Sequence, residues 1–294
     1  GWPGAGCLGA RARQEGERRG VAVWKGSGRD GYIADYIRSE LQPVLASEDL
    51  VILTRTSILD VIEAPAAAAT SGLPGAAERL RALARASALI VRVGGAEEAY
   101  RYHQLLRDYL RGELERREPG VVPALHGRAA AWLADAGRLE EAIEHAIVGE
   151  DVDATAGLVE RAFFATYYGG HADRLDRWLR AFSEQDLERR PSLAVLAAWV
   201  AAISGNPERA DQMAEIAERP TPDEEPIEGH VAFISGRAML RAVMARHGPE
   251  EMLREATLAA EAEGARTAWR ATALWLLGGA QIVSGDARVA DSTL

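Results

Sequence analysis

The sequence contains one cysteine and one lysine in 294 residues, and each scarcity excludes a class of protein. Cys7 alone can form neither an internal disulfide nor a cysteine-rich zinc site, so the chain suits a reducing compartment, and we expect the cytoplasm. Lys25, the single lysine among 34 basic residues, is followed by glycine. A P-loop needs a glycine-rich loop that ends in Lys-Ser or Lys-Thr. The chain therefore lacks a phosphate-cradling loop, and we expect it not to be an enzyme.

Long hydrophobic runs and an excess of positive charge are also missing. The longest apolar run, residues 193–203, is about half of what a membrane-spanning helix needs, and we expect no membrane association. The formal net charge is −10. Residues 120–294 hold 17 basic and 28 acidic side chains, net −11, which leaves residues 1–119 near +1. Because no contiguous basic stripe is present, we expect no direct nucleic-acid binding by this chain.

Histidine is the remaining candidate for metal or acid–base chemistry. No His-x-x-x-His pair and no clustered acidic partner accompanies any of the six, which predicts no metal site and no catalytic constellation. The six are His103, His126, His145, His171, His230 and His247.

The clearest structural pattern in the sequence is a predicted β-hairpin followed by a helix near residue 100. The β-branched run 89–93 can pair with residues 99–102 across a loop that contains Gly94 and Gly95. The following residues place leucines and Tyr109 at three-to-four-residue spacing, with charged residues on the other face. Two strands that lead into an amphipathic helix, with helices before them, indicate a small winged-helix unit.

Three segments in this region resemble a known family. Residues 102–108, YHQLLRD, are similar to the winged-helix histidine segment of STAND-class nucleotide switches. YRYHQLLRDYL (100–110), GYIADYIRSEL (31–41) and LTRTSILD (53–60) together resemble the MalT-type, LuxR-terminated, ATP-dependent transcriptional regulators of bacteria. The three segments occur in the family's order.

The resemblance implies roles for three residues. His103 would contact the β-phosphate of ADP and hold the closed state, and Gly1 and Pro3 would belong to a lid turn against the nucleotide. ATP or ADP is expected only in a full-length protein, with the Walker segments upstream of Gly1, and no cofactor is expected in this chain alone. Without the resemblance, His103 is instead interpreted as a partly buried imidazole that forms its hydrogen bonds with the backbone. The glycine-rich start is likewise interpreted as a frayed terminus.

Beyond residue 118 the pattern is helical and repeats. Five glycines, each followed five positions later by a small or apolar residue, are separated by 33, 35, 43 and 37 residues: Gly137, Gly170, Gly205, Gly248 and Gly285. This is the period of helix-turn-helix arrays such as tetratricopeptide repeats. A glycine can end the first helix in a left-handed conformation, and the small residue lets the second helix pack closely.

Aromatic side chains are spread through this array. Most are expected to fill the seams between helices. Tyr167, Tyr168 and His171 are the exception, because polar-tipped aromatics beside a turn can line a ligand groove.

These patterns predict a mainly α protein, a winged-helix domain followed by an α-solenoid of tetratricopeptide-like helical hairpins. Residues 1–46 are assigned to the end of an ATPase lid, 47–118 to the winged helix and 119–294 to the solenoid. A start without Met and a stop within the repeat pattern favour a piece of a longer protein.

The resemblance implies the regulatory middle of a transcriptional activator. A small-molecule inducer or regulatory protein would bind the solenoid, the winged helix would couple it to the nucleotide site, and the full-length protein would self-associate when active. The alternative is a stand-alone tetratricopeptide-like scaffold for protein interactions. The sequence identifies neither the inducer nor the target promoter nor the oligomeric state.

Overall fold

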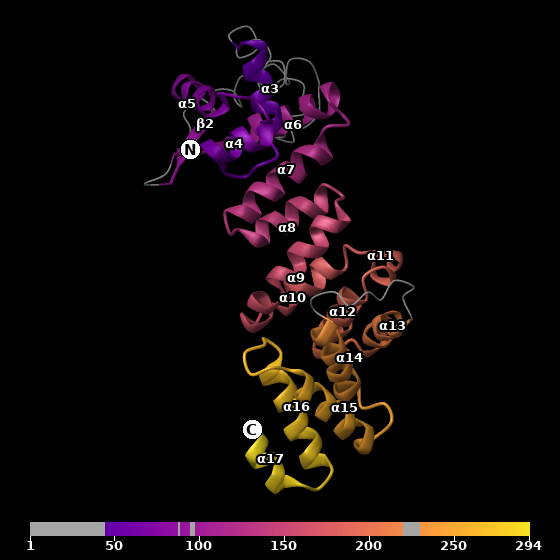
Figure 1. The fold of residues 1–294 in the computed structure, drawn as a ribbon. Helices are drawn as coiled ribbons and strands as arrows, with labels where there is room; N and C mark the ends of the chain where they lie inside the picture. Colours follow the sequence, from indigo (N-terminus) through magenta and orange to yellow (C-terminus); the bar gives the residue numbers. More distant parts are fainter. Residues whose placement is uncertain (1–44, 88, 95–97, 220–229) are drawn as a thin grey trace, which may run out of the picture. The chain divides into compact units, whose positions relative to one another are not determined.

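A computed structural model describes residues 45–87, 89–94, 98–219 and 230–294 (Figure 1). Helices dominate these residues and the only sheet among them is small, which confirms the predicted mainly α class. The chain divides into two compact units, the first ending at Asp151 and the second beginning at Val152. Almost all of the predicted lid segment, residues 1–46, lies outside the described residues. No described helix is long and apolar enough to cross a membrane.

The first unit begins with a winged-helix arrangement. Its elements are α3 (Ser47–Thr56), β1 (Ile62–Glu63), α4 (Ala64–Ser71), α5 (Ala76–Ala86), β2 (Ile90–Val93), β3 (Ala99–Tyr102) and α6 (Gln104–Arg117). The sheet order is β1-β3-β2, and both pairings are antiparallel. Tyr102 lies opposite Ile90, and Ala99 lies opposite Val93. The predicted hairpin and the helix that follows it are therefore confirmed.

Local sequence explains where two of these helices begin and end. Serine favours the N-cap position, yet Ser47 is the first residue of α3, and the N-cap is Ala46, whose N–H donates to the Asp49 carboxylate at 3.1 Å. A carboxylate in the first turn satisfies an otherwise orphaned N–H, so a side-chain hydroxyl at the cap position is not required. α4 ends at Gly72, whose φ of 69° suits glycine.

One hydrophobic core joins these elements to the next helix. It contains residues of α3, α4, α6 and β3 together with Leu125 and Ala129 of α7 (Val122–Asp135). Inside it the hydroxyls of Tyr102 and Thr56 are 2.7 Å apart, and burial raises the pKa of Tyr102. Because α7 contributes to this core, the first helix beyond residue 118 packs as part of the first unit.

In the described residues beyond α6, helices follow one another in pairs, with one short extra helix (Figure 1). The pair in the first unit is α7 with α8 (Leu139–Val148). Those of the second unit are α9 (Val152–Tyr168) with α10 (Ala172–Leu179), α12 (Pro191–Ile203) with α13 (Pro207–Glu218), α14 (His230–Met244) with α15 (Pro249–Ala262), and α16 (Arg270–Val283) with α17 (Ala287–Thr293). The extra helix is α11 (Glu184–Glu188). The predicted array of helical hairpins is confirmed.

The repeated glycines sit in the turns of these hairpins. All five have φ between 74° and 92°, the left-handed region that favours glycine. One hairpin departs from the expected pattern. Ala245, with φ 46°, follows the last residue of α14, and Gly248 caps α15 instead. The turn is longer there, so Leu253 is only half-buried, whereas Ala142 and Ala210 are buried in their hairpins.

Candidate functional site

His103 stands between β3 and α6, where the resemblance places the nucleotide sensor. It is the N-cap of α6, and its Nδ1 accepts a hydrogen bond from the backbone N–H of Leu105 at 3.3 Å. Its own backbone N–H donates to the carbonyl of Leu89 at 2.8 Å. An acceptor at Nδ1 places the proton of the neutral ring on Nε2. The side chain is half-buried, so the cap fixes both the ring and its tautomer.

The proposed nucleotide contacts of Gly1 and Pro3 lie outside the described residues. The role of His103 itself stays a prediction, because the backbone contacts at Nδ1 suit both a structural cap and a sensor that presents Nε2–H.

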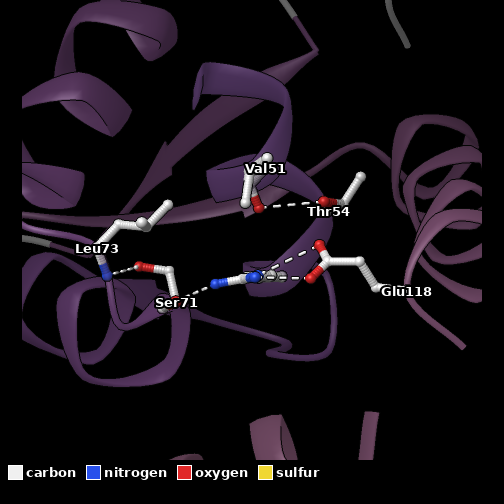
Figure 2. A network of polar contacts seen from close by, with 6 residues as sticks. Val51, Thr54, Ser71, Leu73 and Glu118 are labelled. Atoms are coloured by element: carbon white, nitrogen blue, oxygen red, sulfur yellow. Dashed lines mark hydrogen bonds and ion pairs between the residues drawn. The ribbon is translucent and has the colours of Figure 1, made fainter. Parts of the chain in front are cut away.

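Arg55, in the LTRTSILD segment, ties together the ends of three helices. Its Nη2 and Nε donate to the Glu118 carboxylate at 2.6 and 3.3 Å, and its Nη1 donates to the carbonyl of Ser71 at 3.0 Å (Figure 2). Glu118 is the C-cap of α6, and Ser71 is the last residue of α4. A guanidinium at a helix C-terminus also meets the negative end of the helix dipole. The network fixes the position at which the chain leaves the winged helix.

We expect Arg55→Met to lower the free energy of unfolding of the first unit by about 1–3 kcal/mol, because the Glu118 carboxylate and the Ser71 carbonyl lose their donors. Urea unfolding followed by circular dichroism measures the loss. Arg79→Met is the control: it removes the ion pairs of Arg79 with Glu48 and Asp49 but deprives no backbone carbonyl of its donor, so it should lower stability by less. Equal losses in the two variants would contradict the role given to Arg55.

Two further arginines connect the α7–α8 hairpin to the winged helix. Nη1 of Arg138, the N-cap of α8, is 2.6 Å from Oε1 of Glu63 in β1, and the same guanidinium also binds Glu141. A Cβ atom on Gly72 would lie 2.8 Å from Nη1 of Arg128 in α7, so glycine at the end of α4 leaves room for this arginine. These contacts and the shared core join the first hairpin to the winged-helix domain.

Helix α5 occupies the place at which winged-helix proteins that bind DNA carry their recognition helix. Two of its arginines are used within the domain: Arg79 pairs with Glu48 and Asp49, and Arg81 pairs with Glu98. The Arg81 guanidinium also holds the pKa of Glu98 below its usual value. Both guanidinium groups are thus engaged inside the domain, and residues 1–119 carry a near-neutral charge.

Sequence reasoning missed one cluster of titratable groups. His126 of α7 and His145 of α8 approach each other with their Nδ1 atoms 3.0 Å apart and their ring centroids 4.9 Å apart. Burial lowers the pKa of both rings, that of His126 to about 4. No group of three or more His, Cys, Asp or Glu side chains within the described parts of the chain could hold a metal ion. The repeat period could have indicated this pair, because it predicts that the helices carrying His126 and His145 pack against each other as one hairpin.

In the second unit, aromatic side chains gather around Trp269. We call this group the aromatic cluster; it consists of Phe163, Phe164, Tyr167, Tyr168, Trp199 and Trp269. Trp199 and Trp269 are buried, and their ring centroids are 5.3 Å apart. The Tyr168 hydroxyl donates to the carbonyl of Ala268 at 2.5 Å. The cluster joins α9 to α12 and to the segment before α16, which confirms seam packing for Phe163, Phe164, Trp199 and Trp269.

The predicted ligand-groove residues are only partly brought together. Tyr167 and Tyr168 stand side by side in the aromatic cluster, with centroids 5.1 Å apart, whereas His171 is the exposed N-cap of α10. Their ligand role remains a prediction. A shallow, open pocket of about 510 Å³ lies elsewhere in the unit, among α15, α16 and α17, with Thr257, Arg270 and Thr293 in its lining. Its lining residues come from three helices, so no local sequence pattern marked it.

Comparisons with known proteins bear on the first unit most directly. Residues 40–122 match the family described as the MalT winged helix domain. This region is a MalT-type winged-helix domain. The matched span begins before α3 and ends at the first residue of α7, so it includes His103 and the Arg55 network.

Curated relatives extend the similarity beyond that domain. The chain is 28% identical over 229 residues to the HTH-type transcriptional regulator MalT of Serratia proteamaculans, an alignment that covers 77% of this chain and 25% of that protein. It is 27% identical over 182 residues to the HTH-type transcriptional regulator AlkS of Pseudomonas putida, covering 62% of this chain and 21% of that protein. The chain thus spans about a quarter or less of the length of these relatives.

A solved structure shares the fold. It is a STAND protein with a tetratricopeptide repeat sensor from Pyrococcus horikoshii, with a TM-score of 0.57 and 16% identity over 88% of this chain and 45% of that one. The chain therefore resembles MalT-type STAND regulators in both its winged helix and its helical array, and the resemblance seen in the sequence is confirmed. The winged-helix region is a regulatory domain and not a catalytic one.

Proposed function

We propose that this chain is the regulatory middle region of an ATP-dependent, LuxR-family transcriptional activator of the bacterial cytoplasm. The observation that carries the proposal is the continuous packing between the MalT-type winged helix and the first hairpin of the array, through the shared core and the Arg138–Glu63 pair. Packed side chains and ion pairs at such a joint can carry a signal from a helical array to a nucleotide site.

In this proposal the second unit binds a small-molecule inducer or a regulatory protein, and His103 contacts the bound nucleotide. The aromatic cluster and the open pocket among α15, α16 and α17 are two places that offer a ligand apolar and polar contacts. The full-length protein would hold ATP or ADP and self-associate when active. DNA binding would belong to another domain, because the arginines Arg79 and Arg81 of α5 are already paired.

The test is the substitution of His103 in the full-length protein. A charge-assisted contact from Nε2–H to ADP contributes roughly 1.5–3 kcal/mol, so losing it should shift the switch about ten- to a hundredfold toward the open form. His103→Ala should therefore give weaker ADP affinity and partial transcription without inducer. A reporter assay and ADP calorimetry measure the two effects.

His103→Asn separates this role from the cap. Asparagine is a good N-cap and can replace Nδ1 as the acceptor for Leu105 N–H, but it has no counterpart of Nε2–H at the same reach. Both variants should release the switch, while in this chain alone only His103→Ala should lose stability, by about 1 kcal/mol. If transcription still depended on inducer in both variants, His103 would not be a nucleotide contact.

A further inference from the structure

The His126–His145 pair lies at the joint between the first hairpin and the winged-helix domain. His126 is 9% exposed, and the pair belongs to the two helices that make up the hairpin. A Cβ atom on Gly149, just after α8, would lie 3.2 Å from Cβ of His126, so the turn after α8 closes over the ring. The imidazoles therefore contact each other at a site where His126 is buried and His145 is half-buried.

The geometry of the pair restricts its protons. A hydrogen bond between two Nδ1 atoms 3.0 Å apart needs one nitrogen that carries a proton and one that offers a lone pair. One additional proton on the pair leaves the hydrogen bond in place but adds a buried positive charge. A second additional proton removes the last lone pair, so that two cationic N–H groups face each other.

Charged groups from three neighbouring segments act on the pair. Arg111 of α6 disfavours protonation of both rings, and its guanidinium is held in place by the carbonyls of Ser57 and Ile58. On His145, Asp60, which follows α3, and Glu141 of α8 favour protonation, while Arg138 of α8 opposes it. His126 is influenced by His145 and Arg111 and by no acid. An additional proton on His126 is therefore uncompensated.

We infer that His126 and His145 form a proton-sensitive clasp, which holds α7 against α8 and the winged-helix domain at neutral pH and opens when the pair takes up protons. This inference is independent of the nucleotide-switch proposal, because it concerns only contacts inside the first unit. Opening would loosen α8 from α7, and with it the Arg138–Glu63 pair, at the joint between the first hairpin and the winged helix.

The direction of the pH effect follows from the depressed pKa values. The folded rings bind protons more weakly than the unfolded ones, whose ordinary pKa is 6.5, so the closed hairpin is fully favoured above about pH 6.5. Its stability decreases as the pH falls from there toward about 4, the pKa of folded His126. For His126 alone, these two values correspond at pH 5 to an opening constant about 30-fold larger than at pH 7.5.

Native-state hydrogen exchange on the full chain, followed by mass spectrometry between pH 5 and 7.5, tests the inference. Protection factors of the α7–α8 amides should fall about 30-fold or more, while those of α12 and α13 stay constant. The logarithm of protection plotted against pH gives the number of protons taken up on opening. His145→Asn keeps an amide donor for Nδ1 of His126 and should reduce that number by one.

The double variant His126→Asn/His145→Asn should abolish the pH dependence of α7 and α8. A dependence that persists in it would assign the titration to Asp60 or Glu141 and overturn the clasp. Equal loss of protection in α12–α13 of the unsubstituted protein would overturn it as well. Metal analysis of the purified chain provides a third test. A stoichiometric metal ion bound by the two Nδ1 atoms would exclude the N–H···N hydrogen bond and overturn the clasp. If the double variant does not fold, the proton count of His145→Asn decides alone.

Discussion

Replacing Trp269 by alanine should lower the free energy of unfolding of the second unit by about 3–5 kcal/mol. Trp269 is 6% exposed, and its ring centroid lies 5.1 Å from Phe164, 5.9 Å from Phe163 and 5.3 Å from Trp199. Aromatic pairs in such edge-to-face and tilted arrangements add stabilisation beyond the area they bury. The alanine variant would leave a cavity bounded by rigid rings from α9 and α12, and such a site cannot collapse easily.

Trp275→Ala is the matched control, because it deletes the same side chain six residues further along the chain. Trp275 is 63% exposed, so its removal should change stability little. Urea unfolding followed by far-ultraviolet circular dichroism gives the two free energies, and hydrogen exchange assigns the loss to α9, α12 and α16. Similar values for the two variants would show that the aromatic cluster does not hold the second unit together.

The sequence predicted the elements that depend on local patterns. The hairpin at residues 90–102 followed from β-branched residues around a glycine loop, and the array followed from glycines that recur at hairpin spacing. The turn after α14 was the exception, because Ala245 adopts a left-handed conformation that glycine usually provides. A non-glycine residue in that conformation is held there by the helices on either side, which a local pattern cannot reveal.

Local sequence patterns could not predict contacts between segments that are distant in the chain. Arg55 and Glu118 are 63 residues apart, and Tyr168 and Ala268 are 100 residues apart. His126 and His145 looked unrelated because no short spacing joins them; their contact depends on which faces of α7 and α8 the three-residue turn brings together. The tyrosines of the predicted ligand groove, by contrast, were already adjacent in the chain, but their partners Trp199 and Trp269 come from later hairpins.

The boundary between winged helix and array shows the same limit. Strand-forming patterns end before residue 118, and only helical patterns follow. The predicted boundary between winged helix and solenoid was placed at 118/119 for that reason. Packing groups the chain differently: α7 and α8 lie in the unit that ends at Asp151, and the side chain of Leu125 is completely buried in the winged-helix core. Membership of a repeat family and membership of a compact unit are thus separate properties of this hairpin.

Leu125→Ala should therefore destabilise the winged helix and the first hairpin together, by about 2–5 kcal/mol. Leu125 is on α7, yet it belongs to the same hydrophobic core as Leu53 of α3, Ala67 of α4 and Leu110 of α6. Deleting its side chain opens a cavity in the core that all four helices share. Because the lost contacts belong to both parts, hydrogen exchange should increase in α3, α4 and α6 as well as in α7, while the second unit keeps its protection.

Val148→Ala serves as the control within the same hairpin. Val148 ends α8 and is 55% exposed, so its truncation should change the free energy of unfolding by less than about 0.5 kcal/mol. If Leu125→Ala weakened α7 and α8 but left exchange in α3 and α6 unchanged, the hairpin would be an independent repeat resting on the winged helix. A signal from the array would then need a mobile contact to reach His103, whereas a shared core transmits it by moving α7 and α6 as one body.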